Sequence, residues 1–199
     1  QIVRQHQNPI EGTTVTRKNK NDKIVHEEFF KRVTGLVTGI RAKETPFGMV
    51  WEITLQDGDE DFVLSFSYSS KYTNHFFRAA TNVDFSQPVT FNPWSMKDKK
   101  DPSKTAIGLS LYQHVEGHEK KQKIEFAFTK ENPGKMPDLE HKKVKGKQVW
   151  DDSKQLDFFE KMLENDILPK LGKPTKAAKP EPVAAGISGS EEDLDEAPF

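Results

Sequence analysis

Aromatic rings interleaved with lysine and arginine are the residues of this sequence whose types and spacing best suit a chemical task. A ring can stack on a nucleobase and a cation can neutralise a phosphate, the two contacts needed to hold an unpaired polynucleotide without sequence choice. The candidate rings are Phe47, Trp51, Tyr68, Trp94 and Tyr112. The candidate cations are Arg41, Lys43, Lys97, Lys99, Lys100 and Lys104. We predict that these residues share one binding surface.

Segment 96–104 concentrates four of these cations directly after Trp94. A lysine-rich loop beside an exposed ring would combine phosphate binding with base stacking. The same composition is equally typical of an ordinary solvated loop, so both interpretations of this segment stay open.

Two segments, 47–56 and 61–68, alternate apolar and polar residues with a period of two. The apolar series are Met49, Trp51, Ile53 and Leu55 in the first, and Phe62, Leu64, Phe66 and Tyr68 in the second. This period is typical of a half-buried antiparallel sheet. Most of the aromatic side chains are therefore expected in the core. Phe47, Trp51 and Tyr68, near strand ends, remain candidates for exposed stacking platforms.

The elements that must position these side chains follow one another in an informative order. Strands are predicted at 32–41, 47–56 and 61–68, a helix at 70–81, and further strands at 88–94 and 105–112. Strand, strand, strand, helix, strand, strand is the order of an OB-type Greek-key barrel, whose strand face commonly binds oligonucleotides. Gly35 and Gly39 inside the first strand indicate a bulge or bend that lets this strand serve two sides of the barrel.

Residues after Tyr112 predict an extension of the barrel. Segment 124–129 alternates apolar and polar residues, which predicts a sixth strand. In the body itself, the strand at 88–94 is expected to end at Pro93, before the lysine-rich loop. An amphipathic helix is predicted at about 154–171, with packing against the barrel favoured over partner binding. The fold class is thus mainly β with helices: an OB-fold Greek-key barrel over 32–172 that carries an extra strand and helix.

The two ends of the chain differ in composition from this body. Residues 1–31 are polar and contain Arg17, Lys18, Lys20 and Lys23, which predicts a flexible basic arm that touches phosphates or a plain solvated leader. From residue 173 onward, three lysines accompany six acidic residues, so this segment carries −3 while the remainder carries +2. Its proline, alanine, glycine and serine content predicts a disordered linker at 173–199 that ends in an acidic tail.

Composition and motifs also exclude several classes of protein. Cysteine is absent, which excludes disulfides, thiolate metal sites and cysteine nucleophiles. No apolar run approaches the roughly 18 residues of a membrane span, so we expect a cytoplasmic protein without membrane contact. No phosphate-cradling glycine motif or nucleophile elbow is present, and His114 and His118 lack an evident third metal ligand. We therefore expect no enzymatic activity, no cofactor and no metal.

The last nine residues provide the most specific signal. They are Glu191, Glu192, Asp193, Leu194, Asp195, Glu196, Ala197, Pro198 and Phe199. An OB-like body, a flexible linker and an acidic tip ending in Pro-Phe resemble the single-stranded DNA-binding proteins of bacteria and their bacteriophages. The phage proteins, with an enlarged OB domain, are the closer likeness. Ala197 and the early position of Leu194 depart from the bacterial tip.

This resemblance implies a sequence-independent single-stranded DNA-binding protein of DNA replication, recombination or repair, located in a bacterial cytoplasm. It also implies that the tail residues Glu191–Glu196, Pro198 and Phe199 recruit replication or recombination proteins and compete with DNA for the groove. A merely solubilising terminus is the alternative for the tail. An RNA-binding OB protein and a protein-interaction adaptor are the alternatives for the whole chain. The oligomeric state stays open.

Overall fold

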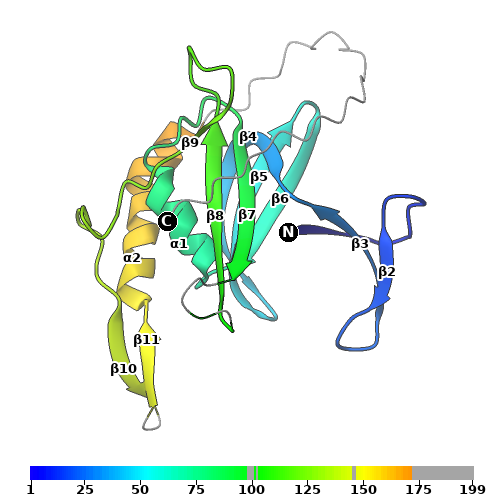
Figure 1. Ribbon diagram of the computed structural model, residues 1–199, viewed down its shortest axis with the longest axis horizontal. Helices are drawn as coiled ribbons and strands as arrows, with labels where there is room; N and C mark the ends of the chain where they lie inside the picture. The colour runs from blue at the N-terminus through cyan, green and yellow to red at the C-terminus, as the bar shows by residue number, and fades with distance from the viewer. Residues whose placement is uncertain (98–100, 102, 145–146, 172–199) are drawn as a thin grey trace.

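A six-stranded antiparallel sheet forms the centre of the protein (Figure 1). The computed structural model describes residues 1–97, 101, 103–144 and 147–171. In spatial order the strands are β6 (Glu60–Ser67), β5 (Gly48–Asp57), β4 (Val33–Thr45), β7 (Val89–Lys97), β8 (Thr105–Gln113) and β9 (Gln122–Lys123). With two α-helices beside this sheet, the described chain is mainly β, as predicted.

Strand β4 has a neighbour on each edge and changes register within its ladder with β5. Its first residues pair with β7, and its longer second part pairs with β5. The register shifts between Val37 and Gly39, which confirms the bulge predicted from the glycines. Gly35 permits a close approach, since a Cβ there would lie 3.0 Å from the Cβ of Leu55. Within the described residues β6 forms no ladder with β8, so the sheet is not observed to close.

Helix α1 (Lys71–Ala80) follows β6 and covers the edge of β8. Ser70 caps its start by accepting a hydrogen bond from the Thr73 amide at 3.1 Å. The next turns bury Phe76 and Phe77 in the core. His75 of this helix is half-buried, and its Nδ1 accepts a hydrogen bond from the backbone amide of Leu109 at 3.2 Å. A side chain of α1 thus satisfies an amide of β8.

Helix α2 (Ser153–Met162) lies on the same side of the main sheet as α1 (Figure 1). It continues into a π-helical turn, η1 (Leu163–Ile167), and a 3₁₀ turn, η2 (Leu168–Lys170). Phe159 stacks on Phe77 of α1, with ring centroids 4.9 Å apart and an interplanar angle of 10°. Phe159, Met162 and Ile167 are buried, so this helix packs against the body, as the sequence favoured.

Segment 124–129, predicted as a sixth strand, forms no strand and instead wraps over the helices. The Ala127 amide donates to the carbonyl of Arg78 at 2.7 Å. Phe126 packs edge-on to His75, and Phe128 packs edge-on to Phe158. The apolar residues of this segment alternate because alternate side chains contact the helices. The prediction of a strand at 124–129 was wrong.

Pro93 does not end its strand, contrary to the prediction, because β7 continues to Lys97. The register places Pro93 opposite Leu109 of β8. Beyond Phe91, β7 has no ladder with β4, so its other edge is unpaired among the described residues. A proline is tolerated at this position because the backbone N–H that it lacks would have no neighbouring strand to donate to.

Residues 1–31, predicted as a flexible arm, form a second antiparallel sheet beside the first (Figure 1). Its strands are β1 (Ile2–His6), β3 (Ile24–Phe30) and β2 (Val15–Lys18), in that spatial order. Arg17, one of the expected phosphate contacts, instead donates two hydrogen bonds to the carboxylate of Glu27, at 2.6 and 2.9 Å. Strands β1 and β2 both pair with β3, and the ion pair of Arg17 with Glu27 joins β2 to β3. These contacts order a segment whose polar composition predicted flexibility.

A β-hairpin precedes α2 and projects at the lower end of the view in Figure 1. It comprises β10 (Glu140–Val144) and β11 (Lys147–Asp151). The predicted linker and tail, 173–199, lie outside the described residues. In the part of the chain that is described, no helix has the length and apolar character to cross a membrane.

Candidate nucleic-acid interface

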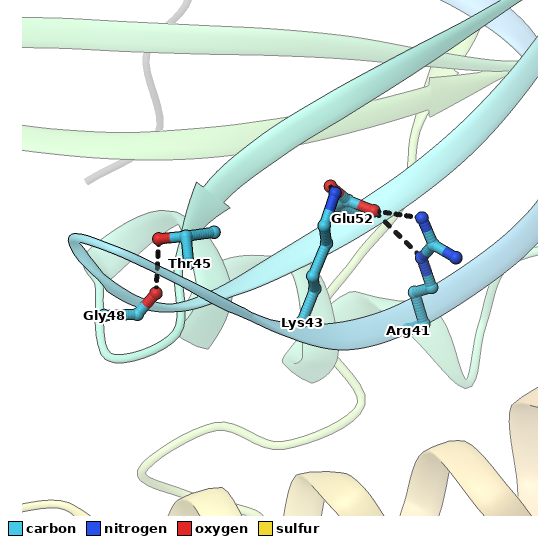
Figure 2. A network of polar contacts seen from close by, with 5 residues as sticks. All are labelled: Arg41, Lys43, Thr45, Gly48 and Glu52. Carbon is cyan, nitrogen blue, oxygen red and sulfur yellow. Dashed lines mark hydrogen bonds and ion pairs between the residues drawn. The ribbon is translucent and has the colours of Figure 1, made fainter.

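The tip of the β4–β5 hairpin holds the most exposed aromatic ring of the candidate set. Phe47 is 97% exposed. The Thr45 hydroxyl donates to the carbonyl of Gly48 at 2.6 Å (Figure 2). The same hydroxyl accepts from the Phe47 amide at 3.2 Å. Gly48 has a φ of +111°, which a residue with a side chain rarely adopts. The turn is braced on both sides of Phe47, so its ring is held in solvent by a defined backbone.

Two candidate cations of the same hairpin share one carboxylate (Figure 2). Arg41 donates to Glu52 Oε2 through Nε and Nη2 at 2.9 and 2.6 Å, and Lys43 donates to Glu52 Oε1 at 2.7 Å. The hydrogen bonds from Lys43 and Arg41 lower the pKa of Glu52, which is therefore ionised at neutral pH. These three side chains together carry one net positive charge, and the exposed carboxylate of Glu44 lies on the same strand, nearer the ring.

Trp51, a predicted stacking platform, is buried and cannot contact a base. Only 1% of its surface is exposed, and its ring stacks on Tyr68 with centroids 5.0 Å apart at 13°. Phe77 of α1 covers it from another side at 4.7 Å. The register places Trp51 opposite Phe66, on the face of β5 that the helices cover. This prediction was wrong because the strand end of β5 still lies beneath the helical layer.

Tyr68 is half-buried and points toward α2 rather than into solvent. Its hydroxyl donates to Glu160 Oε1 at 2.5 Å. Burial, and next this hydrogen bond, raise the pKa of Tyr68. One face of its ring is occupied by Trp51, so Tyr68 joins the sheet to α2 and is a poor stacking platform.

Trp94 and Tyr112 are both half-buried on the β7–β8 ladder. The register places them on the face opposite to that of the buried Phe91 and Leu111. Trp94 lies across Gly108, where a Cβ would come within 2.3 Å of its ring. Each ring therefore has part of its surface free, which is less than Phe47 offers.

The connection between β7 and β8 supplies the remaining predicted cations. Lys97 is exposed at the end of β7, and Lys104 pairs with Asp101 at 3.0 Å. Lys99 and Lys100 lie outside the described residues. In Figure 1 the end of β7, the start of β8 and the β4–β5 tip all lie toward the lower end of the sheet.

Two clefts on the described part of the chain are lined by none of the predicted binding residues. The larger, of about 530 Å³, lies between β1 and β6, where Arg4 and Arg32 face Asp57, Glu60 and Asp61. The second, of about 330 Å³, is lined mainly by apolar residues that include Phe66, Tyr72 and Leu109. Such clefts mix both signs of charge or carry little charge. The candidate surface is thus an exposed end of the sheet and not a pocket.

Trp150 is an exposed ring that the sequence argument did not select. It lies on β11 with 64% of its surface exposed, and its ring contacts that of His141 with centroids 3.7 Å apart. The sequence signal that could have identified Trp150 as a candidate is its position just after the lysine-rich run from Lys142 to Lys147.

Among the residues described, no group of three or more histidine, aspartate or glutamate side chains is placed to hold a metal ion. His114 and His118 flank an exposed turn whose Gly117 has a φ of +83°. No family model matches the chain, and neither a curated protein nor a solved structure matches it.

Proposed function

We propose that this protein binds single-stranded DNA without sequence preference, in DNA replication, recombination or repair, through an OB-type body. The observation that carries the proposal is the braced display of Phe47, 97% exposed, on the hairpin that also presents Arg41 and Lys43. A fully exposed phenyl ring is costly to hydrate, and beside cations it suits a base stacked above a phosphate backbone.

The order of the elements supports the OB assignment within this proposal. Strands β4, β5 and β6 form a meander, α1 follows, and β7 and β8 return beside β4. This order agrees with that of an OB fold, in which the loop between the first two strands and the loop between the last two flank the oligonucleotide site. Those loops correspond to the β4–β5 tip and the β7–β8 connection, which carry Phe47, Lys97 and Lys104.

In the proposed mechanism, stacking and charge neutralisation contribute separately. Phe47 stacks on a base, worth roughly 1–3 kcal/mol, with Trp94 and Tyr112 as partly exposed further rings. Arg41, Lys43 and Lys97 contact phosphates, and each contact lowers the logarithm of the binding constant by about 0.7 per decade of salt. Lys99, Lys100 and Lys104 are candidates for the same role.

The acidic tail adds regulation to the proposal. Its five carboxylates and the ring of Phe199 suit a basic, apolar partner pocket. The same carboxylates compete with DNA phosphates for the cations of the body. DNA binding then releases the tail for replication or recombination proteins.

A titration of the full chain with oligo-dT at two salt concentrations tests the proposal. We expect salt-dependent binding that Phe47→Ala weakens by about 5- to 150-fold, the equivalent of one lost stacking contact. Phe29→Ala is the matched control, because it removes an exposed phenyl ring from β3 instead. Equal affinities for Phe47→Ala and the wild type would overturn the proposed site.

Two further comparisons separate the rival functions. Preference for ribo- over deoxy-oligonucleotides in competition would favour an RNA-binding protein. Removal of residues 191–199 should leave DNA binding as tight or tighter, since a competitor is lost. An absence of binding both with and without the tail would favour a protein-interaction adaptor.

A further inference from the structure

The β10–β11 hairpin presents an exposed tryptophan away from the site described above. Trp150 is 64% exposed, whereas Trp51 is 1% exposed and Trp94 is half-buried. Trp150 lies directly opposite His141 in the register, and the two rings are in contact. The imidazole covers part of the indole and leaves most of it in solvent.

The hairpin is strongly cationic. Between His141 and Trp150 the sequence contains four lysines and no carboxylate. Lys143 lies on the same face as His141 and Trp150, because side chains alternate along a strand, and no ion pair of Lys143 is found in the described part of the chain. On the other face, Lys142 is 3.9 Å from Asp151. A free cation therefore accompanies the exposed ring.

Several contacts attach the base of the hairpin to the body. Lys154 pairs with Glu140 at 2.5 Å. The Ser153 amide donates to Asp151 at 3.1 Å, and the hydroxyl of Ser69 donates to Asp152. These contacts join the base of the hairpin to the start of α2 and to the residue that follows Tyr68.

The base of the hairpin lies close to the β4–β5 tip. Ser69, which contacts it, directly follows Tyr68, and the Tyr68 amide donates to the carbonyl of Met49 at 3.1 Å. Met49 is two residues from Phe47. In Figure 1 the hairpin projects from the same lower end of the molecule as the β4–β5 tip. A strand bound at Phe47 can therefore continue toward Trp150.

We propose that the β10–β11 hairpin is a second contact for single-stranded nucleic acid, in which Trp150 stacks on a base and Lys143 binds a phosphate. The inference rests on the proposed function and extends it beyond the β4–β5 tip. A polynucleotide is the occupant that fits, because a cationic run without a carboxylate attracts a polyanion and the ring accepts any base. The hairpin then lengthens the stretch of DNA that one chain covers.

The test compares oligo-dT of about 8 and about 30 nucleotides, within and beyond the roughly 4–16 nucleotides that one OB fold covers. Trp150→Ala in the full chain should weaken binding of the long oligonucleotide by about tenfold and leave the short one unchanged. Val149→Ala is the matched control, because it removes a neighbouring exposed side chain from the opposite face. Trp150→Phe should retain most of the affinity.

Each other outcome has a distinct meaning. If the wild type binds long oligo-dT and Trp150→Ala binds it equally well, the second contact is refuted and the proposed function stands. If Trp150→Ala weakens both lengths equally, Trp150 belongs to the primary site and the second contact is also refuted. A change in oligomeric state by light scattering would refute it in favour of an interface between copies. No binding by the wild type at either length would defeat the proposed function itself.

Discussion

Trp51 of β5 and Tyr68, just beyond β6, stack on each other with ring centroids 5.0 Å apart. Both rings are candidates from the sequence for contacting bases, and each instead covers the other, with Phe77 of α1 against Trp51. The hydroxyl of Tyr68 continues this contact by donating to Glu160. The pair therefore joins the end of the sheet to the helical layer, and neither ring lies open to solvent as a stacking platform would.

Trp51→Ala should destabilise the protein by about 3–5 kcal/mol, because it opens a cavity under Tyr68 and Phe77. Urea unfolding measures this change. Trp150→Ala is the matched control and should alter the free energy of unfolding by less than about 0.5 kcal/mol, since that ring is exposed. Trp51→Phe should bind oligo-dT as the wild type does. A selective loss of DNA binding in Trp51→Phe with unchanged stability would contradict the buried position.

Tyr68→Phe should lower the free energy of unfolding by about 1–2 kcal/mol, because it removes a hydrogen bond to a carboxylate and leaves Glu160 without that donor. Tyr112→Phe serves as the control, since the Tyr112 hydroxyl forms no hydrogen bond within the described residues. The two variants are compared by urea unfolding. Equal stability of both variants would show that the link to α2 contributes nothing.

Glu52→Gln should strengthen binding to oligo-dT at low salt by about 2- to 10-fold. The carboxylate that holds Arg41 and Lys43 is removed, so both cations become available to phosphates. Glu44→Gln gives the same change in net charge at an exposed position of β4 without freeing a cation. Titrations at low and high salt should separate the two variants only at low salt. Identical affinities would exclude this cation pair from the site.

Gly108→Ala should destabilise the protein by about 1–3 kcal/mol, because its Cβ would lie 2.3 Å from the Trp94 ring and 2.5 Å from that of His75. Displacement of Trp94 should also shift the tryptophan emission. Gly39→Ala is a milder control, since its Cβ would meet only Thr54, at 3.3 Å and beyond. Thermal unfolding and fluorescence report both effects. A Gly108→Ala protein with wild-type stability and emission would contradict the packing of Trp94.

Acid should destabilise the protein through His75. Burial, and next the charge of Arg78, lower the pKa of His75 to about 4, and the neutral ring accepts the Leu109 amide. In the unfolded chain a histidine titrates near pH 6.5, so between about pH 6.5 and 4 only the unfolded state gains this proton. Stability is therefore full above about pH 6.5 and falls toward pH 4. Because the ring is partly exposed, the expected loss is about 1–2 kcal/mol.

Urea unfolding at a series of pH values measures this loss of stability. The variant His75→Gln separates the contribution of His75 from that of the carboxylates, which titrate in the same range. Glutamine can accept the Leu109 hydrogen bond but does not titrate. The variant should therefore lose less stability than the wild type over the same range. Parallel curves for the two proteins would exclude His75 as the cause.

Local features of the chain were predictable from the sequence because they depend on backbone geometry. Ser70 starts α1, and the glycines of β4 mark its bulge, as steric preferences require. Gly58, with a φ of +60°, turns β5 into β6. The alternation in β5 and β6 also identified correctly which residues share a face.

What covers each face was decided only by the tertiary structure. Alternation predicts that Trp51 and Tyr68 point out of the sheet with their apolar neighbours. Only the structure shows that Phe77 of α1 covers Trp51 and that Glu160 of α2 binds Tyr68. Phe126 and Phe128 alternate as in a strand because they pack on two helices. Phe47 and Trp150 remain exposed because their hairpins extend past the core. Burial depends on contacts between distant segments, and a local pattern cannot contain them.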